Sequence, residues 1–433
     1  MASTVGVSML GAGNVGGGVI AALTGAAARY ERTVGRPLEL RRALVRDASR
    51  VRPGLDSSQL TTDIGDVLAD DATQIVIELM GGEDPAHGYI ARALASGRHV
   101  VTANKEVMAK HGASLLAIAA EHQVRLLYEA SVGGGIPIIS PLSRDLLANE
   151  VTAVTAIING TTNFMLTAMA AEGTDYDEIL AEAQRLGYAE PDPTADVEGF
   201  DAAYKLAILC GLAFGLEVPP DALDRQGISA LTAKDFAYAS ELGYTIKLLA
   251  SGRLDGADLI ASVRPTLIDR DEPLAKVDGV LNAVQIEGDL VGSVLFEGPG
   301  AGAAPTASAV LADVLELGRD IVAGRPPSAV APLSAATIVP PGSHRSRYYL
   351  RLTVSDEAGV LGQIAGALGD RDVSIASVLQ VEADEVAGTA ELVLTTHSAA
   401  GGAVTETLTQ IEETQVVQRV GNVLPIAGLR GSR

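Results

Sequence analysis

Lysine is scarce in this chain, where arginine is the usual basic residue among 32 Lys and Arg. A lysine ammonium, with an ordinary pKa of ~10.4, can carry a positive charge and can also give up a proton. A guanidinium, with a pKa above ~12, can hardly release a proton. Where arginine is the default cation, each lysine therefore raises the question of what it does that arginine could not. The lysines are Lys105, Lys110, Lys205, Lys234, Lys247 and Lys276.

Lys205 ends an acidic stretch that has two interpretations. Residues 187–205 read GYAEPDPTADVEGFDAAYK. In the first interpretation this is an acidic loop and a helix on which Asp201 and Lys205 form an ordinary i,i+4 pair. In the second, the pair is partly buried, because it leads into the apolar run 206–216. A buried lysine held by a carboxylate is a positioned proton donor.

A glycine-rich turn follows the first apolar run of the chain. In a turn between a strand and a helix, the first glycine permits a tight bend and the second lets the backbone approach a pyrophosphate. The helix N-terminus then supplies amide groups and a positive dipole. This context favours a dinucleotide site over a plain tight turn. The residues of the turn are Gly11, Ala12, Gly13, Asn14, Val15 and Gly16.

The end of the second predicted strand bears on which dinucleotide binds. The residues there are Arg46 and Asp47. Arg46 can pair with the 2′-phosphate of NADP, whereas Asp47 can bind the ribose of NAD. We expect NADP, with NAD as the alternative. In a third interpretation, Arg46 and Asp47 are a solvated pair on the surface and bind no cofactor.

Short apolar runs alternate with helical patterns before residue 130, which predicts a parallel sheet with helices on both faces. The fold class is therefore α/β, with a Rossmann-type nucleotide-binding domain. The expected strands are 5–10, 38–45, 74–79, 99–102 and 124–128, and the expected helices are 14–28, 85–96 and 105–121.

The end of the chain has a different pattern, βαββαβ, which is typical of ferredoxin-like modules. Its expected strands are 348–354, 373–381, 389–395 and 416–423, and its helices are 360–368 and 403–413. A proline-rich segment precedes it. We therefore predict a nucleotide-binding domain at 1–135, an α+β region at 136–325, a linker at 326–347 and the terminal module at 348–425.

Composition excludes several classes of protein. The net charge of −22 and the pI near 4.6 argue against a nucleic-acid partner, which needs clustered basic residues. The apolar run 206–216 is shorter than the ~20 residues that span a bilayer, so no membrane association is expected. Cys210 is the single cysteine and the N-terminus lacks a basic leader, which suits a cytoplasmic protein.

Taken together, these motifs resemble homoserine dehydrogenase, in its monofunctional form with a C-terminal ACT domain. The resemblance covers nearly the whole chain and implies that the α+β region at 136–325 is the substrate-binding and dimerisation domain. Its most specific part is the stretch 187–205, and it is supported by TANK at 102–105, EASVG at 129–133, GPGAG at 298–302 and PTAS at 305–308.

The resemblance implies reversible, NAD(P)H-dependent reduction of L-aspartate 4-semialdehyde to L-homoserine. Lys205 matches the proton donor of the family, and Asp201 would orient it or bind substrate. Glu190 and Asp196 would join Asp201 in binding the ammonium group of the substrate. Lys105 matches a residue that the family places near both nicotinamide and substrate. It would either orient the substrate or share in the proton transfer. The alternative is a solvated lysine at the start of a helix.

The resemblance also implies a monovalent cation, usually sodium, beside the hinge. Glu129 would supply a carboxylate, and backbone carbonyl groups would complete the set, because a hard cation prefers oxygen. The carbonyl groups are those of Val132, Gly134 and Ile136. Further cofactor contacts are expected at Gly81, Thr102 and Gly302.

In the ACT module, the loop DEAGVL at 356–361 is similar to an amino-acid-binding loop, with Asp356 and Gly359 as the effector contacts. The implied effector is threonine, and the alternative is a purely structural dimerisation module. The resemblance predicts a homodimer or homotetramer.

Two other functions share parts of this pattern. A 2-hydroxyacid dehydrogenase of the phosphoglycerate type also joins a nucleotide fold to an ACT domain, but it needs a catalytic His, and residues 136–325 contain none. A non-catalytic sensor of dinucleotide and amino acid would not require the proton donor at Lys205.

Overall fold

The computed structural model describes residues 4–327, 331–384 and 386–428. Contacts divide the chain into two compact units. Unit 1 comprises residues 1–154, 204–221 and 282–336, and unit 2 comprises 155–203, 222–281 and 337–433. The predicted domain boundaries stay predictions. No helix among the described residues is long and apolar enough to cross a membrane.

Unit 1 is built around a six-stranded parallel sheet of order β3-β2-β1-β4-β5-β6. This confirms the prediction of a Rossmann-type α/β domain. Every residue of β1 is buried, as expected for a strand covered on both faces. The strands are β1 (Val5–Leu10), β2 (Leu38–Leu44), β3 (Leu60–Thr61), β4 (Thr73–Glu78), β5 (His99–Thr102) and β6 (Leu126–Leu127).

The helices of this sheet match the predicted ones closely, with one correction. α4 (Ala86–Ala95) and α5 (Lys105–Glu121) pack on each other. The helix expected at 14–28 is instead two, α1 (Asn14–Gly25) and α2 (Ala27–Val34), because the helical conformation breaks at Ala26, directly after a glycine of low helix propensity. The short helix α3 (Ile64–Leu68) was not predicted.

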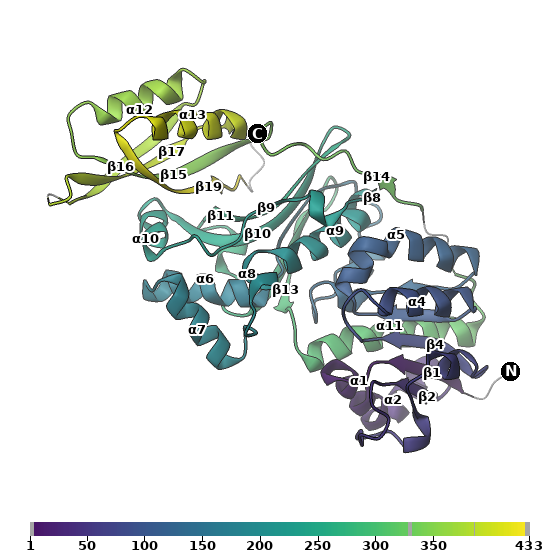
Figure 1. Ribbon diagram of the computed structural model, residues 1–433. Helices are drawn as coiled ribbons and strands as arrows, with labels where there is room; N and C mark the ends of the chain where they lie inside the picture. Colours follow the sequence, from purple (N-terminus) through teal and green to yellow (C-terminus); the bar gives the residue numbers. More distant parts are fainter. Residues whose placement is uncertain (1–3, 328–330, 385, 429–433) are drawn as a thin grey trace. The chain divides into compact units, whose positions relative to one another are not determined.

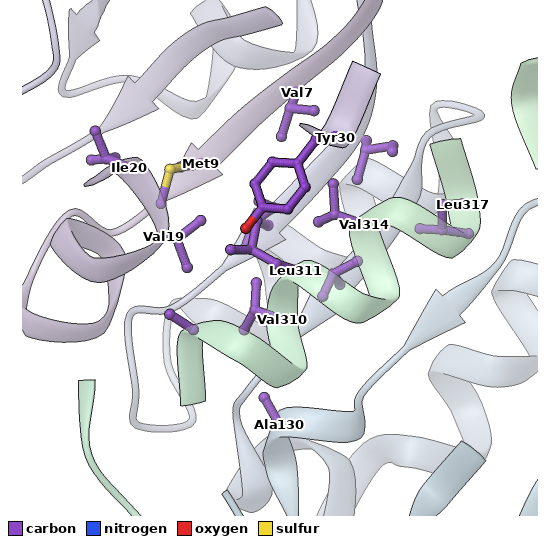
Figure 2. Packing of buried hydrophobic residues seen from close by; sticks show 14 of the residues in the cluster. Val7, Met9, Val19, Ile20, Tyr30, Ala130, Val310, Leu311, Val314 and Leu317 are labelled. Carbon is purple, nitrogen blue, oxygen red and sulfur yellow. The ribbon is translucent and has the colours of Figure 1, made fainter. Parts of the chain in front are cut away.

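A helix from late in the chain completes the core of this domain. α11 (Ala303–Ala323) packs against α1 and α2 (Figure 1). Figure 2 shows its apolar side chains meeting those of β1 and α1. The labelled side chains are Val7, Met9, Val19, Ile20, Tyr30, Ala130, Val310, Leu311, Val314 and Leu317.

Unit 1 also contains several elements outside this sheet. β12 (Leu281–Gly288) and β13 (Gly292–Pro299) are neighbouring strands, and β8 (Leu216–Glu217) pairs in parallel with β14 (Ser334–Ala335). β7 (Val151–Ile157), α9 (Phe200–Phe214) and, by its first residue, β12 each cross the boundary between the units. α9 contains most of the predicted apolar run, and it ends one residue before Gly215, whose φ is +68°.

Unit 2 contains the predicted βαββαβ module. Its antiparallel strands have the order β19-β15-β17-β16, and α12 and α13 lie together beside them (Figure 1). The elements are β15 (Arg345–Ser355), α12 (Val360–Gly369), β16 (Ile375–Asp384), β17 (Thr389–Thr396), α13 (Gly401–Glu413) and β19 (Val417–Ile426).

The rest of unit 2 joins this module through one continuous sheet. β10 (Tyr244–Asp255) pairs with β11 (Asp258–Asp269), and Leu267 of β11 pairs with Ile426 of β19. The helices of this part are α6 (Gly160–Glu172), α7 (Tyr176–Leu186), α8 (Thr194–Val197) and α10 (Ala233–Glu241).

Candidate active site

The glycine-rich turn has the geometry that a pyrophosphate requires. Gly11 has φ +99°, and a Cβ atom there would come within 2.8 Å of the Leu79 carbonyl oxygen. A Cβ on Gly16 would lie 2.6 Å from the Gly11 carbonyl oxygen. Gly13, the N-cap of α1, has no atom near its missing side chain and makes no side-chain cap. The first amides of α1 are thus open to an anion.

The loop after β2 holds the residues predicted to select the dinucleotide. Arg46 and Asp47 are both exposed. The Asp47 carboxylate accepts hydrogen bonds from the hydroxyl and the amide of Ser49, at 2.6 and 2.9 Å, which lower its pKa. Arg52, which we did not predict, donates from Nη1 to the Ala12 carbonyl at 3.1 Å. It therefore links this loop to the glycine-rich turn.

The loops after β4 and β5 lie at the same edge of the sheet. Gly81 is exposed with φ +71°. Thr102 is fully buried, and its hydroxyl donates to Glu78 Oε2 at 2.5 Å. Its predicted cofactor contact stays a prediction. Gly302 is the N-cap of α11, the helix that packs on α1.

The two predicted catalytic lysines lie on neighbouring helices. Lys105 is the first residue of α5, and Lys205 lies in the second turn of α9. Further along α5, Lys110 Nζ is 5.6 Å from the centre of the Tyr204 ring. Tyr204 directly precedes Lys205 on α9, so the two helices are in contact there. Both predicted lysines are half-buried. Asp201 is buried and precedes Lys205 by four residues, so the two share a face of α9.

Asn159 brings two of the predicted substrate-binding acids together. Its Nδ2 donates to Asp196 Oδ1 at 2.7 Å and to Asp201 Oδ2 at 3.0 Å. Its Oδ1 accepts from the Thr162 amide at 2.8 Å and so caps α6. Glu190 is exposed. Sequence reasoning missed Asn159; its position at a helix start was the available signal.

The predicted cation turn is tied down by a buried carboxylate. Glu129 accepts hydrogen bonds from the amides of Ile138, Ile139 and Ser140, at 2.6 to 2.8 Å. The carboxylate therefore has a structural task, and its role as a cation ligand stays a prediction. No group of three or more His, Cys, Asp or Glu side chains within the described ranges could hold a metal ion. The predicted set relies mostly on backbone carbonyl groups.

A second buried acid supports the same turn. Asp313 Oδ2, on α11, accepts a hydrogen bond from the Glu129 amide at 3.0 Å. Burial raises the pKa of Asp313 well above its usual range. A carboxyl group whose pKa is raised by folding contributes stability at low pH, and that contribution is lost as the pH rises through the raised pKa.

Asp313→Asn should therefore stabilise the protein at high pH. The amide oxygen still accepts from Glu129, but nothing ionises, so we expect a melting temperature a few degrees above wild type at pH ~8 and none of this gain near pH ~4. Asp320→Asn, which removes a partner of Arg125 on the same helix, is the matched control and should give no gain. Identical pH profiles for Asp313→Asn and wild type would contradict the prediction.

The predicted effector loop lies between β15 and α12. Asp356 and Gly359 are exposed, and Gly359 caps α12 with φ +97°, a conformation that favours glycine. The Asp356 amide donates to the Gly388 carbonyl at 2.9 Å. The effector contacts themselves stay predictions.

Comparison with known proteins decides the family. A family model described as homoserine dehydrogenase matches residues 137–315. A second family model, described as the NAD-binding domain of homoserine dehydrogenase, matches residues 11–129. A homoserine dehydrogenase of Synechocystis sp. is 40% identical over 434 residues, which cover 98% of this chain and 99% of its own. The chain belongs to the homoserine dehydrogenase family. It is an NAD(P)-dependent oxidoreductase, and an ACT-domain model matches residues 348–413.

Solved homoserine dehydrogenases have the same fold. The enzyme of Thiobacillus denitrificans has a TM-score of 0.93 and 40% identity, covering 99% of each chain. A hyperthermophilic archaeal homoserine dehydrogenase in complex with NADPH has a TM-score of 0.61 and 28% identity, covering 72% of this chain and 97% of its own. These matches do not favour a phosphoglycerate-type dehydrogenase or a sensor.

Proposed function

We propose that this chain reduces the aldehyde group of L-aspartate 4-semialdehyde to the alcohol of L-homoserine, reversibly, as a step towards threonine and methionine. The observation that carries the proposal is the contact between Lys110 and Tyr204. It brings α5, which begins at Lys105, into contact with α9, which carries Lys205, within a unit that also holds the glycine-rich turn.

The side chains have complementary tasks. The Lys205 ammonium neutralises the developing alkoxide and gives its proton to that oxygen, while Asp201 holds Lys205 or binds substrate. Asp196, Asp201 and Glu190 attract the ammonium group of the amino-acid substrate. Lys105 orients the substrate or shares the proton transfer.

The residues present fit a nicotinamide dinucleotide, because Gly11 and Gly16 hold the turn tight against the protein backbone, and Gly13 leaves open space beside the first amides of α1. When bound, the reduced dinucleotide supplies the hydride.

The turn 129–136 suits a monovalent cation such as sodium. Gly133 and Gly134 adopt φ of +72° and +57°, which lets the backbone turn its carbonyl groups toward a cation.

The ACT module suits an amino-acid effector, and we propose threonine at the loop of Asp356 and Gly359. Pairing of such modules between chains would make a homodimer or homotetramer. We place the protein in the cytoplasm, in keeping with its single cysteine, which is buried.

One assay tests the reaction. Loss of the NADPH absorbance band is measured with and without aspartate semialdehyde, and homoserine is identified by mass spectrometry. Oxidation that depends on the semialdehyde is expected. Binding of NADPH with no turnover of any added semialdehyde would indicate a sensor instead.

Arg46→Ala should weaken the use of NADPH selectively. Removal of one charge-assisted contact to the 2′-phosphate is expected to raise the apparent KM for NADPH about tenfold and to leave that for NADH within about twofold. Arg50→Ala, which removes another exposed guanidinium of the same loop, is the control. Equal changes for both dinucleotides would contradict the preference for NADP.

A further inference from the structure

Glu78 is a fully buried acid at the carboxyl end of β4, and it has no role in the chemistry described above. Its side chain has 0% exposure. Oε1 accepts from the Met80 amide at 2.7 Å, and Oε2 accepts from the Thr102 hydroxyl at 2.5 Å. Burial raises the pKa of this carboxyl group. Burying a carboxyl group costs free energy of desolvation that an apolar side chain at this position would avoid. The presence of Glu78 therefore points to a specific task for its carboxyl group.

The hydrogen bonds of Glu78 continue into the loop that begins α5. The Thr102 hydroxyl accepts from the Asn104 amide at 3.0 Å. Asn104 Oδ1 accepts from the Val107 amide and so caps α5, while its Nδ2 donates to the Gly82 carbonyl at 2.7 Å. The loop after β4 and the loop after β5 are thus joined twice, through Glu78 and through Asn104.

These two loops have a special position in the sheet. The strand order turns between β1 and β4, and in such sheets ligands bind outside the carboxyl ends of the strands at this point. Glu78 ends β4, and Lys105 directly follows Asn104. A side chain that connects both loops there sets the distance between the Gly81–Gly82 turn and Lys105.

We propose that Glu78 is a positioning residue of the reaction: its carboxylate holds the Gly81–Gly82 turn and the start of α5 in one arrangement, so that Lys105 meets the nicotinamide end of the dinucleotide. This inference rests on the proposed function. A misplacement of about 1 Å at a catalytic group can cost about 100-fold in rate, so the effect should appear in turnover as well as in stability.

Glu78→Gln tests the proposal with little change of shape. The amide has one accepting oxygen where the carboxylate has two, so either Met80 or Thr102 loses its acceptor. We expect kcat to fall about tenfold or more. The affinity for NADPH, measured by nicotinamide fluorescence, should fall about threefold. This measurement tests the placement of the Gly81–Gly82 turn without depending on catalysis.

Thr73→Val is the matched control. Thr73 is buried at the opposite end of the same strand, and its hydroxyl is 2.7 Å from that of Ser8. This variant loses a buried hydrogen bond away from the cofactor edge, so its melting temperature should fall while kcat and NADPH affinity stay within twofold of wild type.

Asn104→Asp supplies a second test should Glu78→Gln fail to fold. It retains the cap of α5 but removes the donor to Gly82, and it should also lower kcat about tenfold. Wild-type values of kcat and NADPH affinity in a folded Glu78→Gln or Asn104→Asp, or equal losses in Thr73→Val, would overturn the inference. Lack of turnover in wild type would instead overturn the proposed function, and NADPH affinity would still decide the role of Glu78.

Discussion

Replacing Lys205 with alanine is expected to lower kcat by about 100-fold to 10,000-fold, while NADPH still binds with its wild-type affinity. In the proposed reaction this side chain supplies the proton for the alkoxide, and a water molecule in its place would not be held against the developing charge. Binding should survive because the glycine-rich turn and the N-terminus of α1 belong to a different part of unit 1. Steady-state kinetics and fluorescence titration measure the two effects separately.

Two further variants sharpen this prediction. Lys205→Arg keeps a positive charge but hardly releases a proton, so it should remain far below wild type. Lys276→Ala removes an exposed lysine and should turn over normally. A Lys205→Ala enzyme with kcat within about twofold of wild type would refute the assignment of the proton donor.

Asp235→Ala is expected to destabilise unit 2 by about 3 to 5 kcal/mol, because it removes the nearest carboxylate partner of a buried guanidinium, which keeps Glu391 at 3.4 Å. Asp235 has no exposed surface, and Arg351 is 4% exposed. Arg351 Nε is 2.7 Å from Asp235 Oδ1, and Asn422 Nδ2 donates to Oδ2 at 2.7 Å. These bonds join α10 to β15 and β19 of the ACT module. Denaturation midpoints should therefore fall markedly.

The matched control for this pair is an ion pair at the surface. Arg185→Ala breaks a bridge to Glu182 whose side chains are 68% and 41% exposed, so a loss below about 1 kcal/mol is expected. The double variant Asp235→Leu with Arg351→Met should recover much of the stability, since it removes both charges. A midpoint for Asp235→Ala no lower than that for Arg185→Ala would contradict the prediction.

Local patterns predicted the elements of the fold well. The expected ranges 5–10, 99–102 and 105–121 coincide with β1, β5 and α5. A parallel strand is covered on both faces, so it forms a continuous apolar run, and a change of period then marks the helix that follows. The same reasoning predicted the βαββαβ order of the terminal module.

Partners far apart in sequence could not be predicted in this way. Asp313 and Glu129 are 184 residues apart, and Asp235 and Arg351 are 116 apart. Each of these side chains alone is typical of a solvated surface. Packing of α11 buries Asp313 beside Glu129, and packing of the ACT strands buries Arg351 beside Asp235. The resemblance to a family supplied candidate site residues, but not the side chains that hold them, such as Asn159 and Glu78.

In the proposed reaction, hydride passes from a bound dinucleotide to aspartate semialdehyde while Lys205 protonates the oxygen. The most direct test uses NADPH deuterated at the transferred position, with mass spectrometry of the product. We predict homoserine carrying one deuterium on the carbon of the new alcohol, formed by wild type and nearly absent with Lys205→Ala. Unlabelled homoserine, or labelled homoserine formed equally fast by both proteins, would contradict the claim.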